Sequence, residues 1–363
     1  MIYKYFLKRL LLIIPTLFII LLLNFAIIQA APGGPIEKFL AQINHTKITN
    51  EVAENKMNNI DIKNISSTTN TKYQGSIGIE PELIMQLEKD FGFNLPAHQR
   101  FVQMLKKFLA FDFGQSFYQD KQIIDLIYEK LPVSISLGLW TVLITYLIAI
   151  PLGIKKAIFN GSKFDIYSSS IIIVLFAIPS FLLAIFLIVI FAGGNFLNIF
   201  PLRGLVSENF MELNWYQKIF DYIWHLILPI FSMVIGAFAA LTFFTKNAFI
   251  EEINKNYVLC AKAKGQTMQK ILYFHIFRNA LMIVIAGLPA TLLGIFFTSS
   301  MLIEVIFSLD GLGLLAYESA VSRDYPLIFA SVYIFTLLGL ISNIISDLTY
   351  RIVDPRIDFE KHN

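Results

Sequence analysis

The chain has 363 residues and a formal net charge of +3, and only 15% of its residues are charged. A soluble domain carries about 25% charged residues, whereas 56% of this chain is hydrophobic and its mean hydropathy is +0.64. The basic residues are scattered, so the sequence lacks the basic patch that is typical of a nucleic-acid-binding surface. The single cysteine, Cys260, excludes a disulfide within the chain and a metal site built on cysteine ligands. The composition therefore predicts a membrane protein.

Six apolar stretches are long enough to cross a bilayer, because a helix needs about 20 apolar residues to span the hydrocarbon layer. Unpaired backbone groups are too costly in hydrocarbon for other open structures, so we expect each stretch to be helical. The stretches are residues 10–30, 134–154, 167–192, 223–245, 280–301 and 327–347. The predicted fold class is all-α, a polytopic membrane protein with six transmembrane helices.

The first stretch has an alternative interpretation as a signal peptide. Lys8 and Arg9 precede it, and Gln29-Ala30-Ala31 resembles a cleavage site. Its apolar run of about 20 residues is longer than the 7–15 of a signal core, which favours a retained membrane span.

The short loops alternate in charge along the chain. The N-terminus and residues 155–165 and 246–279 are rich in Lys and Arg, whereas residues 193–222 and 302–326 contain more acidic than basic residues. The positive-inside rule assigns the first group to the cytoplasm. We therefore expect both termini to be cytoplasmic in a bacterial inner (plasma) membrane.

The span pattern divides the chain into four parts. Residues 44–74 are polar and lack helical periodicity, whereas the apolar spacing within 81–92, 101–109 and 123–131 predicts helices. The predicted parts are an N-terminal transmembrane helix (1–30), a helical extracytoplasmic insertion (31–133), a five-helix transmembrane domain (134–349) and a cytoplasmic tail (350–363).

The motifs of common enzyme sites are absent from the sequence. It contains no G-x-x-x-x-G-K-[ST] phosphate loop, no H-E-x-x-H metal motif and no G-x-S-x-G elbow. Asp112-Phe113-Gly114 matches a kinase tripeptide, but no glycine-rich loop or lysine-bearing strand accompanies it. The sequence therefore gives no support for an enzyme, for a metal site or for ATP binding by this chain.

The loop at residues 246–279 carries six basic and two acidic residues, and it is longer than a connection between two spans requires. Tyr257, Ala261 and Lys264 share one helical face by their i, i+4, i+7 spacing. Small side chains at Cys260, Ala261 and Ala263 allow another protein to approach the helix closely. Gly265 can adopt a positive φ and end that helix. A helix seated in a groove is a defined recognition mode, so the loop is a candidate docking surface. The alternative is an ordinary basic loop that obeys the charge rule.

The same loop resembles the coupling loop of bacterial ABC importer permeases of the dipeptide and oligopeptide class. The residues that carry this resemblance are Ala261-Lys262-Ala263-Lys264-Gly265, His275 and Arg278-Asn279-Ala280. The general motif opens Glu-Ala-Ala, and Leu259 stands here in place of the glutamate.

Further blocks in family order extend the resemblance over nearly the whole chain. They are Lys8–Thr16, Ala31-Pro32-Gly33-Gly34-Pro35, Ile303–Ser308, Gly311-Leu312-Gly313, Arg323-Asp324-Tyr325-Pro326 and Asp354-Pro355-Arg356. The enlarged first loop also resembles the Yej-type subgroup, which imports microcin C and oligopeptides. So do the blocks Phe111–Gly114, Leu131–Trp140, Phe200–Ser207 and Pro355–Glu360.

The resemblance implies the type I ABC importer permease fold and a division of labour among subunits. It implies a second related permease, a cytoplasmic ATPase that holds ATP and Mg, and a periplasmic binding protein that delivers peptide. This chain would hold no cofactor. The residues that the resemblance assigns to ATPase coupling are Tyr257, Cys260, Ala261, Ala263, Lys264 and Gly265, and those that support the loop are His275, Arg278 and Asn279.

Two acidic residues lie at the ends of predicted spans, and charge at the centre of a membrane helix costs about 2.5–3.5 kcal/mol. Glu304 is a candidate contact for a peptide amino group on the substrate path, with a purely structural role as the alternative. Asp347 is spaced to pair with Arg351. Arg323 and Asp324 are expected to form a local turn.

Other functions are open at this point. A proton-coupled secondary transporter would need acidic residues deep within its spans, and the predicted spans are almost free of charge. A receptor or assembly protein anchored by six helices would not need the coupling block. A permease of the same family for another small solute is a further alternative.

Overall fold

A computed structural model describes residues 2–30, 95–116, 118–119, 121–193, 196–289, 291 and 300–353. In this part of the chain the regular elements are helices, and the β contact is an isolated bridge between Gln115 and Gln122. The predictions for residues 31–94 and for the tail from Asp354 onward lie outside the described residues.

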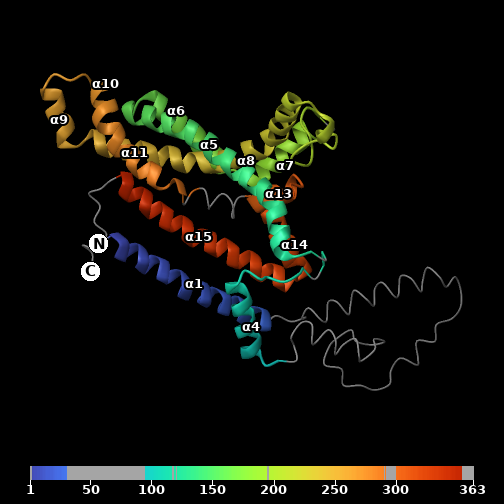
Figure 1. Cartoon of the computed structure of the whole chain (residues 1–363). Helices are drawn as coiled ribbons and strands as arrows, with labels where there is room; N and C mark the ends of the chain where they lie inside the picture. The colour runs from blue at the N-terminus through green and yellow to red at the C-terminus, as the bar shows by residue number, and fades with distance from the viewer. Residues whose placement is uncertain are drawn as a thin grey trace, which may run out of the picture. The chain divides into compact units, whose positions relative to one another are not determined.

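The elements follow one another along the chain as short and long helices (Figure 1). They are α1 (Ile2–Ala30), α4 (Ala97–Leu109), α5 (Ile123–Ile158), α6 (Lys163–Phe176), α7 (Ser180–Phe191), η2 (Phe210–Glu212), α8 (Trp215–Ile253), α9 (Asn256–Ala263), α10 (Met268–Ile271), η3 (a π-helix, Leu272–Ile276), α11 (Phe277–Ala286), α13 (Ser300–Ile306), α14 (Leu312–Ser322) and α15 (Tyr325–Val353).

Four helical segments are long and apolar enough to cross a membrane, judged by length and composition within the described residues. They are Arg9–Ala26 of α1, all of α5, all of α8 and Tyr325–Thr349 of α15. The pair α6 and α7 is bent by 86° and makes a fifth span if it is counted as one. These correspond to five of the six expected spans. The remaining one, residues 280–301, falls partly outside the described residues.

Helix α5 joins two elements that the sequence analysis treats separately. It runs without a break for 36 residues, so the expected helix near residues 123–131 and the second span are one helix. The expected boundary between the insertion (31–133) and the transmembrane domain (134–349) therefore falls inside a continuous helix, which also contains Pro132.

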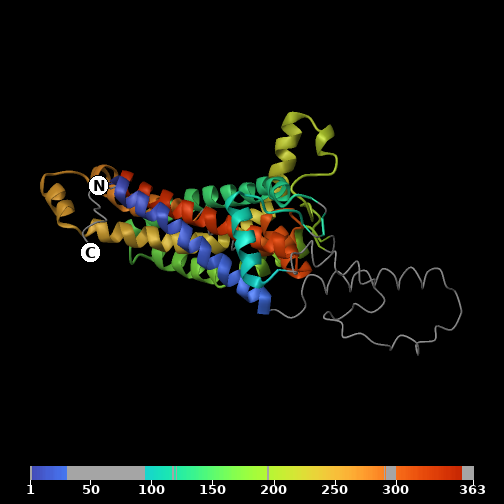
Figure 2. The ribbon, with the colours of Figure 1, turned by 60° about the horizontal axis from the view of Figure 1, so that its bottom comes forward.

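The described chain forms two compact units. The larger contains residues 1–10, 125–318 and 334–363, and the smaller contains residues 11–124 and 319–333. Within the larger unit, the loop with α9 and α10 lies at one end and residues 196–222 lie at the opposite end (Figure 1, Figure 2). The two loops that differ in charge are therefore separated by the length of the apolar helices.

Helices α5 and α8 approach closely at one glycine. A Cβ atom on Gly153 would lie 2.7 Å from Cβ of Thr245 and 2.8 Å from the carbonyl oxygen of Thr242. Both threonines are fully buried. Only glycine fits this contact without displacing a backbone.

In the smaller unit, aromatic residues pack α4 between the neighbouring helices. Phe101 of α4 lies 5.6 Å from Phe18 of α1, and Phe108 lies 5.5 Å from Tyr333 of α15, both edge to face. Such ring pairs add about 0.5–1.5 kcal/mol beyond the area that they bury.

We expect Gly153→Ala to lower the thermal stability of the subunit, because the added methyl overpacks the contact with α8 at a cost of about 1–3 kcal/mol. The matched control is Gly339→Ala in α15, where an added Cβ would meet nothing within 4 Å. Thermal unfolding of both purified variants measures the difference. Equal unfolding temperatures would contradict the close packing of α5 on α8.

Candidate functional site

The turn between α8 and α9 is fixed by one buried acid. Glu252, near the end of α8, accepts a hydrogen bond of 2.6 Å from the Tyr257 hydroxyl and forms an ion pair with Lys255. Its side chain is nearly inaccessible to solvent. The first residue of the predicted coupling set, Tyr257, therefore anchors the helix to the end of α8.

Burial raises the pKa of Tyr257 to about 12, and the hydrogen bond to Glu252 acts in the same direction, whereas a hydrogen bond with Asn279 acts against it. The neutral phenol is the form that the folded chain stabilises. The contribution of this phenol to the free energy of unfolding is present below the usual pKa of 10.0, and it is lost only as the pH rises toward about 12. The contact therefore holds at every physiological pH.

One face of α9 packs against the membrane-proximal core. Val258 is fully buried and Ala261 is nearly so, in a cluster that includes Phe249 of α8 and Ala157 of α5. The remaining members of the cluster come from α10, η3 and α11, and they are Ile271, Leu272, Ile276, Ala280, Leu281 and Val284. An eight-residue helix is too short to be stable alone in water, so this packing holds α9 in one orientation.

The opposite face of α9 is open. Leu259 is 61% exposed, and Cys260, Lys262 and Ala263 are also exposed. This arrangement corrects one expectation, because the small side chain of Ala261 lies on the inner face and not on the outer one. We define the outer face of α9 as these four residues together with Lys264 and Gly265, which follow the helix and are exposed.

The end of α9 has the predicted glycine cap. Gly265 has φ of +78°, and its amide donates to the carbonyl of Lys262 at 2.9 Å. The amide of Gln266 donates to the carbonyl of Ala261 at 3.2 Å. This pair of bonds is a Schellman motif, which requires a left-handed residue at the glycine position. The prediction that Gly265 ends the helix is confirmed.

The residues predicted to support the loop follow in η3 and α11. His275 lies on η3, and its Nε2 is 3.1 Å from Oε1 of Gln266, which links the π-helix to the cap of α9. Arg278 and Asn279 lie on α11 and are exposed. A π-helical turn inside a longer helix is often found at a functional site. Here it also exposes Tyr273 and Phe274.

Glu304 is fully buried, which favours the structural role of the two roles that the sequence left open. Its side chain is 0% exposed, and its carboxylate accepts bonds from the Ser134 hydroxyl at 3.0 Å and from the Leu314 amide at 2.8 Å. A Cβ on Gly311 would lie 2.5 Å from the Glu304 carboxyl carbon. The carboxylate caps the start of α14, where it complements the helix dipole.

The other charged residues at span ends also have structural partners. Asp347 forms an ion pair with Arg9 of α1, and the predicted partner Arg351 has no described side chain. Arg323 has φ of +58°, and Asp324 is buried and accepts a bond of 2.6 Å from the Ser116 hydroxyl. The prediction of a local turn before α15 is confirmed.

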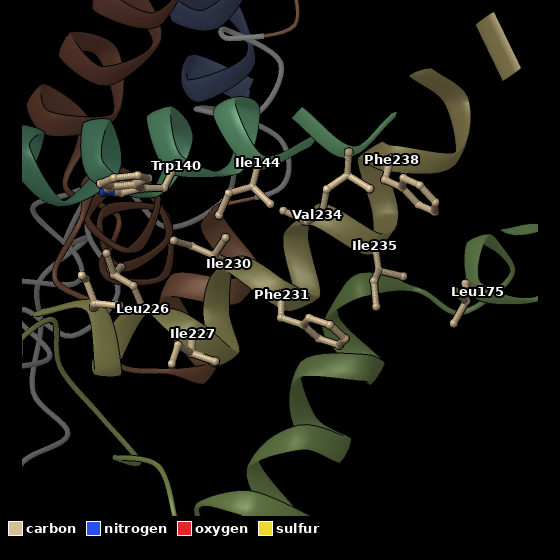
Figure 3. A pocket seen from close by; sticks show the side chains of 12 residues that line it. Trp140, Ile144, Leu175, Leu226, Ile227, Ile230, Phe231, Val234, Ile235 and Phe238 are labelled. Carbon is tan, nitrogen blue, oxygen red and sulfur yellow. The ribbon is translucent and has the colours of Figure 1, made fainter. Parts of the chain in front are cut away.

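An apolar cavity of about 500 Å³ lies between α5, α6 and α8. Trp140 and Ile144 of α5 line it on one side, and Ile230, Val234 and other apolar residues of α8 line it on the other (Figure 3). The indole nitrogen of Trp140 is the one polar side-chain atom in this lining, and it donates to the Tyr222 hydroxyl at 3.1 Å. The cavity therefore offers no charged group for the ends of a peptide.

The chain matches the family model described as "Binding-protein-dependent transport system inner membrane component" over residues 149–359. It is 52% identical to "Inner membrane ABC transporter permease protein YejB" of Escherichia coli O157:H7, over 98% of this chain and 99% of that protein. It is also 52% identical to "Peptidoglycan transport system permease protein YejB" of Agrobacterium fabrum, over 99% of both. It is 31% identical to "Oligopeptide transport system permease protein AppB" of Bacillus subtilis, over 98% and 99%.

Among solved structures, the permease chain of the inward-facing MetNI methionine ABC transporter aligns with a TM-score of 0.49 and 16% identity, over 63% of this chain and 96% of that one. The sequence matches decide the family. The chain belongs to the inner membrane components of binding-protein-dependent transport systems. Within that family it is a permease of the peptide ABC transporter group, with the type I importer permease fold. These matches give no support to the alternatives of a secondary transporter or a receptor.

We expect Glu304→Ala to lower the thermal stability of the subunit by about 1–3 kcal/mol, because it leaves buried donors without an acceptor. The apparent affinity of the remaining complex for peptide should stay unchanged. The control is Glu208→Ala at an exposed acid. Thermal unfolding and uptake kinetics separate the two roles, since normal stability with weakened peptide affinity would restore the substrate-path assignment.

Proposed function

We propose that this chain is one membrane subunit of an ATP-driven oligopeptide importer and that α9 is its coupling helix. The observation that carries the proposal is the fixed orientation of α9. Burial of Val258 and Ala261 presents Leu259, Cys260 and Ala263 outward on a short helix that is capped at Gly265. Small exposed side chains on a rigid helix suit insertion into a groove of a partner protein.

The charges around the outer face favour an acidic partner surface. Lys262, Lys264 and Lys270 are exposed on and beyond the outer face, whereas Lys255 is paired with the buried Glu252. Complementary charges steer association and fix the register of docking. The proposed partner is a cytoplasmic ATPase subunit, which holds ATP and Mg and moves α9 when it closes on nucleotide.

The proposed cargo is a peptide. The relative from Bacillus subtilis is named for oligopeptide transport and that from Agrobacterium fabrum for peptidoglycan transport. Peptide-bearing fragments of peptidoglycan and microcin C-like peptides share the peptide backbone with oligopeptides, so all three belong to one chemical class. A periplasmic binding protein would deliver the cargo, and a second permease related to this chain would complete the membrane path.

The proposed orientation places both termini and α9 in the cytoplasm. The basic loop that contains α9 and the more acidic residues 196–222 lie at opposite ends of the larger unit. Positive loops are retained on the cytoplasmic side of a bacterial membrane. The charge pattern and the separation of the loops both support this orientation.

We expect Gly265→Trp to abolish ATP-driven peptide uptake while the subunit still inserts in the membrane. A Cβ on Gly265 would meet nothing within 4 Å, so the indole would project from the outer face into the space that the partner needs. The matched control is Gly114→Trp, because Gly114 has φ of +74° and an equally open Cβ position. Uptake of a labelled tripeptide by cells and immunoblots of membrane fractions measure the two effects.

The control isolates docking from backbone strain. Both substitutions force a bulky residue into a left-handed conformation, at a cost of about 1–2 kcal/mol. Loss of uptake in the Gly265 variant alone therefore supports docking at α9. Normal uptake by an inserted Gly265→Trp subunit would reject the coupling role.

A further inference from the structure

A buried lysine lies where three helices of the larger unit meet, near the end of α5, the start of α6 and the end of α8. We call these the inner ends of the three helices. The side chain of Lys156, near the end of α5, is 0% exposed. Its Nζ donates to the Ser168 hydroxyl at 2.8 Å, to the Ser169 hydroxyl at 2.7 Å and to the carbonyl oxygen of Asp165 at 2.9 Å. All three acceptors belong to α6, so this one ammonium group ties α5 to the first turns of α6.

Asp165 extends the same cluster to α8. Its Oδ1 lies 3.0 Å from Nζ of Lys156, and its Oδ2 accepts a hydrogen bond of 2.8 Å from Lys246 of α8. The amide of Gly161 in the α5–α6 turn donates to the same Oδ2 at 3.1 Å. The carboxylate is almost entirely buried. We call Lys156, Asp165 and Lys246 the inner clamp.

The inner clamp adjoins the apolar core that holds α9. Ala157 follows Lys156 directly, and Phe249 lies about one turn after Lys246 on α8. Ala157 and Phe249 both belong to the cluster that buries Val258 and Ala261. The backbones of α5 and α8 therefore join the core that buries α9 to the clamp, and the clamp contacts α6.

Helix α6 is the first half of the pair α6–α7, which is bent by 86° and makes one span if it is counted as one. Its first two turns are tied to α5 by polar contacts of Lys156 with Asp165, Ser168 and Ser169. Buried ion pairs contribute little net stability compared with apolar packing, because desolvation offsets their attraction. They do fix one geometry, because a carboxylate left without its partners is costly in a buried site.

We propose that Asp165 is a positioning residue that makes the inner ends of α5, α6 and α8 move with α9 as one body. This inference rests on the proposed function of α9 as the coupling helix. When the ATPase displaces α9, the clamp carries the displacement to the bent α6–α7 span. Without the clamp, α9 still docks and the ATPase still turns over, but α6 no longer follows.

The test is the number of peptides transported per ATP hydrolysed by the complete complex reconstituted in proteoliposomes. Asp165→Asn keeps the shape of the side chain and removes its charge. We expect this variant to assemble and hydrolyse ATP while the transport ratio falls about fivefold or more, within the usual range of coupling between sites. Asp165→Glu, which restores the charge, should recover part of the ratio.

Lys163→Gln is the matched control, because Lys163 lies two residues from Asp165 on the same helix and is exposed. It should transport with the wild-type ratio.

A variant at Lys246 covers the case in which Asp165→Asn fails to assemble. Lys246 is 14% exposed, so Lys246→Gln removes one bond to Asp165 from the accessible edge of the cluster. We expect the ratio to fall for this variant also.

A wild-type transport ratio in an assembled Asp165→Asn complex would overturn the inference, as would a wild-type ratio for Lys246→Gln where the first variant does not assemble. Loss of transport in the Lys163→Gln control equal to that in Asp165→Asn would also overturn it. Failure of the proposed function gives a different result. Either the wild-type complex would show no peptide uptake driven by ATP, or an inserted Gly265→Trp subunit would transport normally.

Discussion

The packing of α9 on Phe249 is the contact on which the functional interpretation depends. Phe249 is fully buried on α8, and it shares a cluster with Val258 and Ala261 of α9. Because those two side chains are buried, the exposed face of α9 is the one that carries Leu259 and Cys260. Without this core, the orientation of α9 would vary, and the helix could not transmit a defined displacement.

The four acids that are buried among the described residues all lie at or near a helix end. Glu252 holds the α8–α9 turn, Asp165 lies in the first turn of α6, Glu304 caps α14 and Asp324 precedes α15. Unsatisfied amides at a helix start and cationic side chains are suitable partners for a carboxylate. No other acid is buried in the part of the chain that the structure describes, so polar contacts of these acids fix how the helices join at their ends.

Much of this arrangement could be predicted from the sequence, because its signals are local. Apolar stretches of about 20 residues predicted the four spans that the described residues contain, and a fifth if α6 and α7 count as one. Gly265 predicted the end of α9 from the left-handed conformation that only glycine adopts freely. The turn at Arg323 and Asp324 was predicted for the same kind of reason. In each case the residues that decide the structure are neighbours in the chain.

The supports of the site could not be predicted, because they join residues far apart in the sequence. Nothing local shows that Lys246 meets Asp165, or that Ser134 and Leu314 bind the carboxylate of Glu304. The helical spacing that grouped Ala261 with an outer face gave no direction for the core, and Val258 supplied the missing orientation. The resemblance to importer permeases pointed to this loop, but it did not say which side of α9 faces inward.

The reactivity of Cys260 tests the central claim most directly, because it is the one cysteine in the chain and it lies on the outer face of α9. The measurement is the rate at which a maleimide modifies Cys260, followed by mass spectrometry, in the membrane complex with and without its ATPase subunit. The account predicts rapid modification without the ATPase and strong protection when the ATPase is bound. Equal rates in the two preparations would contradict the assignment of α9 as the surface on which the ATPase acts.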